Sequence, residues 1–163
     1  MAILNQTYYS MKQIVLFAFL ALLCSRGLQA QNEKFKALFI YNFTKYLDWP
    51  AGFSQGDFVI GILGSTAIED ELKIIAQKKQ VGNMTIVISH FNTPESVTKC
   101  HLLFIPSSKS DNLGTITGKF GKTASIIITD EQGLAQKGSD INFVVKEGKQ
   151  NFEINKKIGR AHV

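Results

Sequence analysis

The sequence predicts a single α/β domain of three layers (Rossmann-like), with a mostly parallel sheet and a C-terminal antiparallel hairpin. Apolar runs of strand length alternate with segments of helical periodicity, and the inner runs are continuously apolar, as in strands covered on both faces. The last two runs alternate apolar and polar residues around a short turn, as hairpin strands do. With 163 residues, of which 45% are apolar, the chain has the size of about one domain.

The first predicted element of the domain is a helix over residues 32–47. Its apolar residues recur at helical spacing and form one broad face. That face comprises Phe35, Leu38, Phe39, Phe43, Tyr46 and Leu47, whereas Lys34, Lys36, Thr44 and Lys45 fall mostly off it. Trp49 and Pro50 are expected to stop the helix, because proline cannot continue it and biases the preceding residue toward extended geometry.

The remaining elements follow from the same patterns. Residues 57–64 read as the first strand, and residues 66–80 as a helix with Ser65 or Thr66 as its N-cap. Ile68, Leu72, Ile75 and Ala76 are its expected core positions. The later predictions are strand 84–89, strand 101–105 ended by Pro106, helix 113–120, strand 123–129, a helical turn at 131–136, and hairpin strands 141–146 and 150–155.

Both ends of the chain look separate from this domain. Residues 1–30 have the layout of a secretory signal peptide, with Lys12, an 11-residue apolar run from Ile14 to Cys24, and Ala30 at the cleavage point; Met11 is an alternative start. The run is shorter than the ~20 residues needed to span a bilayer. Leu23 directly before Cys24 argues against a lipoprotein signal, and a buried N-terminal helix is the remaining alternative.

The mature domain is therefore expected over residues 31–157, exported and without membrane insertion after cleavage. Residues 158–163 read like a translated sequencing adapter, so we expect the natural frame to be lost after Lys157 and the domain to be truncated there; a genuine short polar tail is the alternative. The formal charge of +5 falls to +3 without residues 1–30 and to +2 without Arg160. Such a small excess does not indicate a nucleic-acid partner.

The sequence carries no pattern typical of catalysis, metal binding or a bound cofactor. The segment Gly61–Gly64 lacks the three glycines of a dinucleotide fingerprint, and His90 and His101 are not spaced as zinc ligands. Ser65, Thr66 and Asp130 follow predicted strands, at the edge where α/β proteins place ligands, so they form a candidate ligand edge. Helix capping is the alternative role for each.

Two further features have open interpretations. Cys100 is the one thiol left after signal cleavage; it is a packing residue, the partner of a cysteine beyond this sequence, or one half of an intermolecular disulfide. The stretch Tyr41–Pro50 is rich in aromatic residues, with Trp49 as an end cap over the core, and its Asn42 is expected to bond a neighbouring loop or chain.

This stretch resembles the opening motif of the YfiR family of secreted bacterial proteins. The matching residues are Phe39 to Pro50, with Tyr41, Asn42, Phe43, Lys45, Asp48, Trp49 and Pro50 at its characteristic positions. The segments Val59–Gly64, Cys100–Ile105, Ile141–Val144 and Asn151–Asn155 are similar to further family strands. The resemblance covers residues 33–157.

The resemblance implies a periplasmic α/β protein that is not an enzyme. It implies a membrane-anchored partner, either a diguanylate cyclase of the YfiN type or a sensor kinase, whose periplasmic sensor domain the protein binds and represses or tunes. Release of this repression would raise the level of cyclic di-GMP, and biofilm formation would follow. The protein could also form a homodimer. The motif residues, above all Lys45, Asp48 and Trp49, are the candidate partner surface. A periplasmic module that binds a small ligand at Ser65, Thr66 and Asp130 is the rival function.

Overall fold

The computed structural model describes residues 31–121 and 123–155. Residues 31–43 form the N-terminal helix. The elements that follow are the 3-10 helix η1 (Ala51–Phe53), β1 (Phe58–Leu63), α2 (Ile68–Ala76), β2 (Gln80–Val81), β3 (Met84–Phe91), β4 (Leu102–Ile105), η2 (Ser107–Asn112), α3 (Leu113–Phe120), β5 (Ile126–Thr129), η3 (Leu134–Lys137), β6 (Ile141–Lys146) and β7 (Lys149–Ile154). The expected signal peptide and the expected adapter segment lie outside the described residues.

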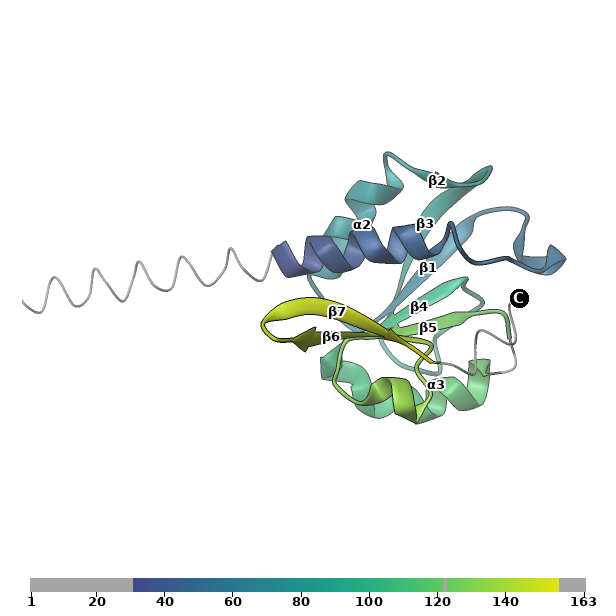
Figure 1. Ribbon diagram of the computed structural model, residues 1–163. Coiled ribbons are helices and arrows are strands. Elements are labelled where there is room, and N and C mark those ends of the chain that lie inside the picture. The colour runs from purple at the N-terminus through teal and green to yellow at the C-terminus, as the bar shows by residue number, and fades with distance from the viewer. Residues whose placement is uncertain (1–30, 122, 156–163) are drawn as a thin grey trace, which may run out of the picture.

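The strands form one sheet in the order β2-β3-β1-β4-β5-β6-β7 (Figure 1). Strands β3, β1, β4, β5 and β6 run parallel, and β2 and β7 pair antiparallel at the two edges. The predicted α/β class, the mostly parallel sheet and the closing hairpin are confirmed. The parallel order reverses between β1 and β4, which is the doubly wound arrangement.

Helices cover both faces of the sheet, so the domain has three layers. The N-terminal helix and α2 lie on one face, and α3 lies on the other (Figure 1). Side chains of β1 alternate between the two cores: Phe58, Ile60 and Ile62 belong to the first, and Leu63 to the second. This continuous burial explains why the inner strands read as unbroken apolar runs.

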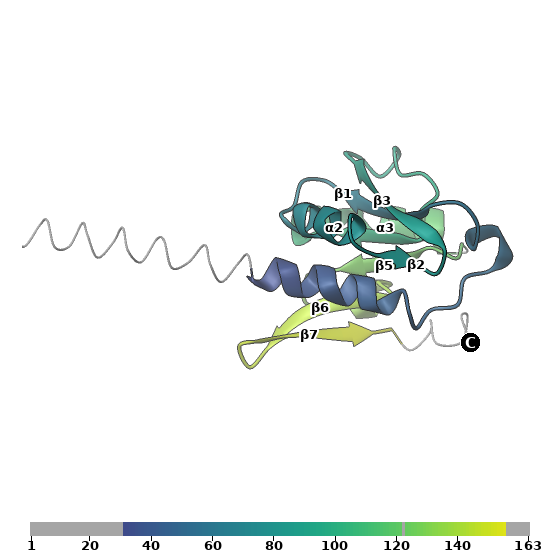
Figure 2. The same ribbon diagram turned by 90° about the horizontal axis from the view of Figure 1, so that it is seen from above.

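The N-terminal helix runs between α2 and the β6–β7 hairpin, as two perpendicular views show (Figures 1 and 2). Two of its phenylalanine rings contact Phe152 of β7, with centroid distances of 5.5 Å from Phe39 and 5.1 Å from Phe43. Ala37 and Ile40 face the sheet and are completely buried. The helix therefore contributes to the core on its sheet side and to the hairpin contact on its flank.

The expected boundaries and face of this helix were partly wrong. It ends at Phe43, well before Trp49 and Pro50, in a turn in which the Thr44 hydroxyl donates to the carbonyl of Tyr41 at 2.6 Å. Leu38 and Tyr46, expected on the apolar face, are 50% and 85% exposed. Lys36 and Thr44, expected off that face, are buried. The buried stripe passes through positions 33, 36, 37, 40 and 44, because flanking elements enclose the helix on more than one side.

Other local predictions met with mixed success. The predicted helix 113–120 coincides with α3, and Ile68 and Leu72 are buried as expected. The helix α2 ends at Ala76, because residues 80–81 pair with β3 as the short edge strand β2, which the sequence did not indicate. Its N-cap is Ala67, without a side-chain cap, in place of Ser65 or Thr66.

The hairpin turn places Glu147 and Gly148 at φ of 52° and 73°. Positive φ at both central residues is what a two-residue type I′ turn requires. Strand β7 starts at Lys149, one residue before the predicted boundary.

Candidate functional site

The N-terminal helix and the loop after it reach both ends of the parallel strands. Near its start, Lys36 contacts Asp130, which directly follows β5. Beyond its end, the ring of Trp49 packs against Phe58, the first residue of β1. The carboxyl ends and the amino ends of the sheet therefore carry two different constellations on one continuous segment.

The carboxyl-end constellation is a buried ion cluster. The ammonium of Lys36 donates to Asp130 Oδ2 at 2.7 Å and to Glu33 Oε1 at 3.0 Å, and the three side chains are only 10–12% exposed. The other oxygen of Asp130, Oδ1, accepts the backbone N–H of Ser107 at 2.6 Å, which ties the cluster to the loop after β4. Burial alone would lower the pKa of Lys36, but the hydrogen bonds and charges of Asp130 and Glu33 outweigh it and raise that pKa.

A cleft of about 620 Å³ opens beside this cluster. It is lined by Asn32, Glu33, Lys36, Asp130, Glu131, Gln132, Phe143, Val144, Val145 and Gln150. Two of its acceptors, Glu33 Oε2 and Gln150 Oε1, are buried and have no hydrogen-bond partner. Asp130 of the expected ligand edge thus lies at a hollow of the surface, held by Lys36.

The other two residues of the expected ligand edge, Ser65 and Thr66, do not line this cleft. They follow β1, at the point where the strand order reverses. Just before them, Gly64 has a φ of +77°, and a side chain there would meet the carbons of Lys109. The structure therefore separates the predicted edge into two places, and the hollow one surrounds Asp130.

The amino-end constellation is centred on His101. Its Nδ1 accepts the backbone N–H of Val59 at 3.0 Å, and its Nε2 donates to the carbonyl of Phe53 at 2.7 Å. Its ring stacks on Phe58 with a centroid distance of 4.3 Å. Burial lowers the pKa of His101, and the bond from Val59 requires a neutral Nδ1, so the histidine is a neutral structural residue.

Trp49 belongs to the same constellation. Its ring lies edge-on to Phe58 at 5.2 Å and to His101 at 5.3 Å, and its Nε1 is buried without a partner. The side chain of Trp49 is half-buried rather than exposed. This burial and these ring contacts are what the interpretation of Trp49 as an end cap over the core predicts. Phe43 likewise faces Phe143 and Phe152, so part of the expected partner surface points inward.

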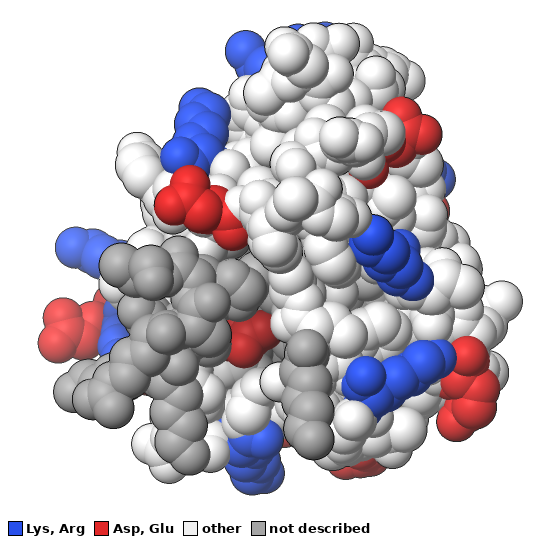
Figure 3. Space-filling view, turned by 90° about the vertical axis from the view of Figure 1, so that its right-hand side faces the viewer, with Lys and Arg blue, Asp and Glu red and all other residues white. Residues whose placement is uncertain are grey.

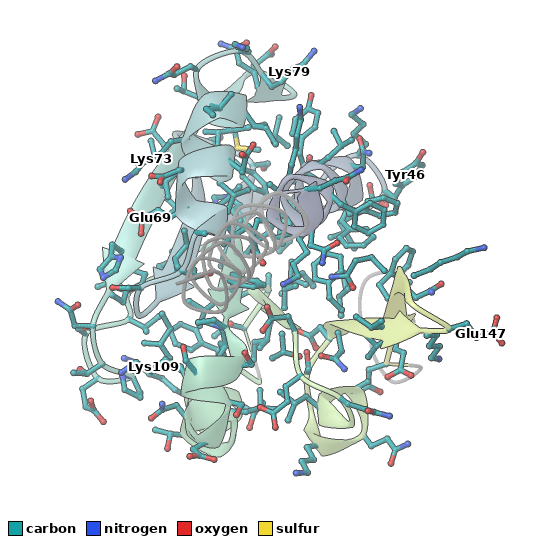
Figure 4. All side chains as sticks on the ribbon, turned by 90° about the vertical axis from the view of Figure 1, so that its left-hand side faces the viewer. Tyr46, Glu69, Lys73, Lys79, Lys109 and Glu147 are labelled. Atoms are coloured by element: carbon teal, nitrogen blue, oxygen red, sulfur yellow. The ribbon has the colours of Figure 1, made fainter. Side chains whose placement is uncertain are left out.

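The outward part of the motif consists of Lys45, Tyr46 and Asp48, which we call the motif patch. All three are exposed, and Tyr46 is the most exposed large apolar side chain of the described residues, at 85%. Figure 4 shows Tyr46 projecting on the same side as Glu147 at the hairpin tip, and away from Glu69 and Lys73.

The ammonium of Lys45 lies 4.8 Å above the ring of Tyr41 and 3.3 Å from Asn42 Oδ1. Asn42 therefore bonds within its own turn, where a contact with a neighbouring loop or chain was expected. Pro50 is exposed and directly precedes η1.

The titratable side chains outside these constellations include Cys100, Asp140 and His90, whose pKa values are shifted. Burial raises the pKa of the Cys100 thiol to about 12, so the sulfur is a packing group in the second core. Asp140 precedes β6, and its Oδ2 accepts the amide of Ile127 at 2.5 Å; burial raises its pKa to about 6. On the surface, the hydrogen bond to Glu69 raises the pKa of His90.

Sequence reasoning missed Glu33, Lys36 and Gln150, which form the cleft with Asp130. The available signal was a Glu–Lys pair three residues apart, placed in phase with the buried positions Ala37 and Ile40.

Within residues 31–121 and 123–155, no group of three or more His, Cys, Asp or Glu side chains could hold a metal ion. On the face in Figure 3, lysines are scattered singly among uncharged and acidic residues.

Comparison with models of protein families gives a match. A family model described as YfiR/HmsC-like matches residues 33–163. No curated protein matches the chain. In the part of the chain that the structure describes, no helix has the length and apolar character needed to cross a membrane.

Proposed function

The chain belongs to the YfiR/HmsC-like family of periplasmic regulators, and from this premise we propose that it controls a membrane-anchored signalling protein by binding its periplasmic sensor domain. The family is regulatory rather than catalytic. The partner we propose is a diguanylate cyclase of the YfiN type or a sensor kinase. Binding would hold that partner in its inactive state, and a cyclase held in this way would make less cyclic di-GMP.

The observation that carries the proposal is the motif patch of Lys45, Tyr46 and Asp48. A tyrosine that is 85% exposed buries little of its ring within this domain. Large aromatic side chains beside charged groups are the usual composition of interface hot spots, because they bury much apolar area and keep a polar atom for a directed bond. The patch therefore has the chemistry of a protein-binding surface.

The inward half of the motif supports the same proposal, because it holds the patch on a firm base. Thr44 is bonded to the carbonyl of Tyr41, and the amide of Tyr46 donates to the carbonyl of Phe43 at 3.0 Å. On the other side of the patch, Trp49 is packed on Phe58 and His101. A surface that is ordered before binding loses less conformational entropy when the partner docks.

The test uses Tyr46→Ser, with Ile74→Ser on α2 as its matched control. Ile74 is also a large, exposed apolar residue, at 46%, but it lies outside the motif. We expect Tyr46→Ser to weaken binding to the periplasmic domain of a membrane cyclase or kinase encoded beside this protein. The expected loss of affinity is at least about 10-fold, as for loss of a hot-spot side chain. Calorimetry on the purified domains measures the affinity, and cellular cyclic di-GMP reports repression where the partner is a cyclase.

Both variants should fold, because exposed substitutions usually change stability by less than about 0.5 kcal/mol. Equal loss of binding in Tyr46→Ser and Ile74→Ser would place the contact elsewhere. Unchanged binding in Tyr46→Ser would overturn the assignment of the motif patch. Failure of the wild-type protein to bind any periplasmic sensor domain encoded beside it would overturn the proposed function itself.

A further inference from the structure

The cleft at the carboxyl ends of β5 and β6 contains polar groups that the motif patch does not use. Its wall combines charged residues of the N-terminal helix and the loop after β5 with apolar residues of β6. Ligands of open α/β sheets bind beyond the carboxyl ends of the strands. The position of the cleft therefore agrees with a ligand site, and its chemistry defines the kind of ligand.

Two buried acceptors in the cleft lack a donor. Glu33 is only 9% exposed, and while its Oε1 accepts from Lys36, its Oε2 is buried and unpartnered. Gln150, which reaches the cleft from β7, has a buried and unpartnered Oε1. Buried polar atoms in native proteins are nearly always hydrogen-bonded, so this pair marks a place where a donor-rich group belongs.

The charge of the cleft selects the sign of that group. Glu33, Asp130 and Glu131 contribute three carboxylates, and Lys36 contributes one ammonium, which Glu33 Oε1 and Asp130 Oδ2 already hold. The excess charge is negative, and both open positions are acceptors. An anion would be repelled, whereas a cation with N–H donors satisfies charge and hydrogen bonding together.

We propose that this cleft binds a small organic cation through a primary ammonium group, with Glu33 Oε2 and Gln150 Oε1 accepting its N–H bonds. Val145, which is 64% exposed, is the apolar lining residue that the carbon chain of the ligand would contact. A metal ion fits less well, because the ammonium of Lys36 stands between the two best carboxylates. The site is independent of the partner contact, since the motif patch lies beyond the opposite end of the helix.

Three probes separate the parts of this proposal when the whole chain is titrated with each. n-Butylammonium carries charge, N–H donors and a short carbon chain. 1-Butanol keeps the chain without the charge, and tetramethylammonium keeps the charge without N–H donors. We expect n-butylammonium alone to raise the melting temperature saturably and to give a calorimetric binding isotherm, because a ligand that binds only the folded state stabilises it.

Variants then locate the site. Glu33→Gln and Gln150→Leu should each weaken n-butylammonium at least about 10-fold, since each removes one acceptor of a charge-assisted hydrogen bond. Gln150 is outside the ion cluster, so Gln150→Leu keeps the test valid if Glu33→Gln is unstable. Glu153→Gln, which removes a carboxylate from the same strand but outside the cleft, should bind normally.

Several outcomes would overturn the proposal. They are the absence of saturable n-butylammonium binding, equal binding of 1-butanol or tetramethylammonium, and unchanged affinity in Gln150→Leu. Loss of sensor-domain binding in the earlier experiment would leave this result untouched, because the probes are titrated without any partner.

Discussion

At the amino ends of the parallel strands, both ring nitrogens of His101 are hydrogen-bonded, and three aromatic rings surround the imidazole. At the carboxyl ends, Lys36 bridges two buried carboxylates, and acceptors of Glu33 and Gln150 remain open. The surroundings of His101 are aromatic and its ring is neutral, whereas the carboxyl-end constellation is charged and lies beside a cleft. One continuous segment, from the N-terminal helix to η1, contributes to both.

The difference shows which end of the sheet is stabilised by packing and which end keeps polar groups available for binding. A neutral histidine among rings gains from packing without the desolvation cost of an ion. A buried ion cluster pays that cost, and it is retained only where its geometry offsets the penalty or where its groups have a further use. Disrupting each end in turn tests the comparison.

The largest effect is expected at the carboxyl end, from Lys36→Met. This change leaves Glu33 and Asp130 buried without their cation, which should lower the free energy of unfolding by about 3–5 kcal/mol. Urea denaturation at neutral pH measures it. The matched control is Lys73→Met: Lys73 pairs with Glu69 at a similar distance of 2.8 Å, but its side chain is 53% exposed.

Because water and salt screen the exposed pair, Lys73→Met should change stability little. Equal effects of the two substitutions would show that burial of the Lys36 cluster has no energetic weight. The two ends would then not differ in the electrostatic contribution to stability.

The next effect is expected at the amino end, from Trp49→Ala. Removing this half-buried ring takes away its contacts with Phe58 and His101 and should cost about 3 kcal/mol, near the low end for large-to-small core changes. Trp49→Phe, which keeps an aromatic ring, should cost less than half as much. Urea denaturation checks both.

The same experiment decides between the two roles considered for Trp49. If Trp49→Ala keeps wild-type stability but loses sensor-domain binding, the ring belongs to the partner surface. If it is destabilised as expected, its contribution to binding is indirect, through the support of the motif patch.

Much of the fold follows from short-range pattern. Continuous apolar runs predicted β1, β3, β4 and β5, and the alternation around Glu147 and Gly148 predicted the hairpin. The position of Asp130 after a strand predicted its place at the carboxyl edge. In each case the deciding information lies within a few residues of the element concerned.

The parts that escaped prediction depend on distant residues. Lys36 reads as a surface lysine until Asp130, 94 residues later, supplies its counter-charge. Tyr46 reads as a core aromatic until the helix is seen to end at Phe43. His101 acquires its role only from Val59 and Phe53, more than 40 residues earlier in the chain. Local periodicity carries no information about such pairs.

The last prediction concerns pH, through Asp140, which lies outside both constellations. Burial raises the pKa of this carboxyl from 3.8 to about 6, so the folded protein holds the proton more tightly than the unfolded chain does. The stabilisation is complete below the unfolded value and is lost as the pH rises through about 6. Asp140→Asn, which cannot ionise, should remove this dependence.

The measurement is the difference in free energy of unfolding between Asp140→Asn and the wild type, over about pH 4 to 7. The wild type should lose stability relative to the variant as the pH rises. His90 and His101 titrate in both proteins, so their contributions cancel in the difference. A difference that stays constant with pH would mean that water reaches the Asp140 carboxylate.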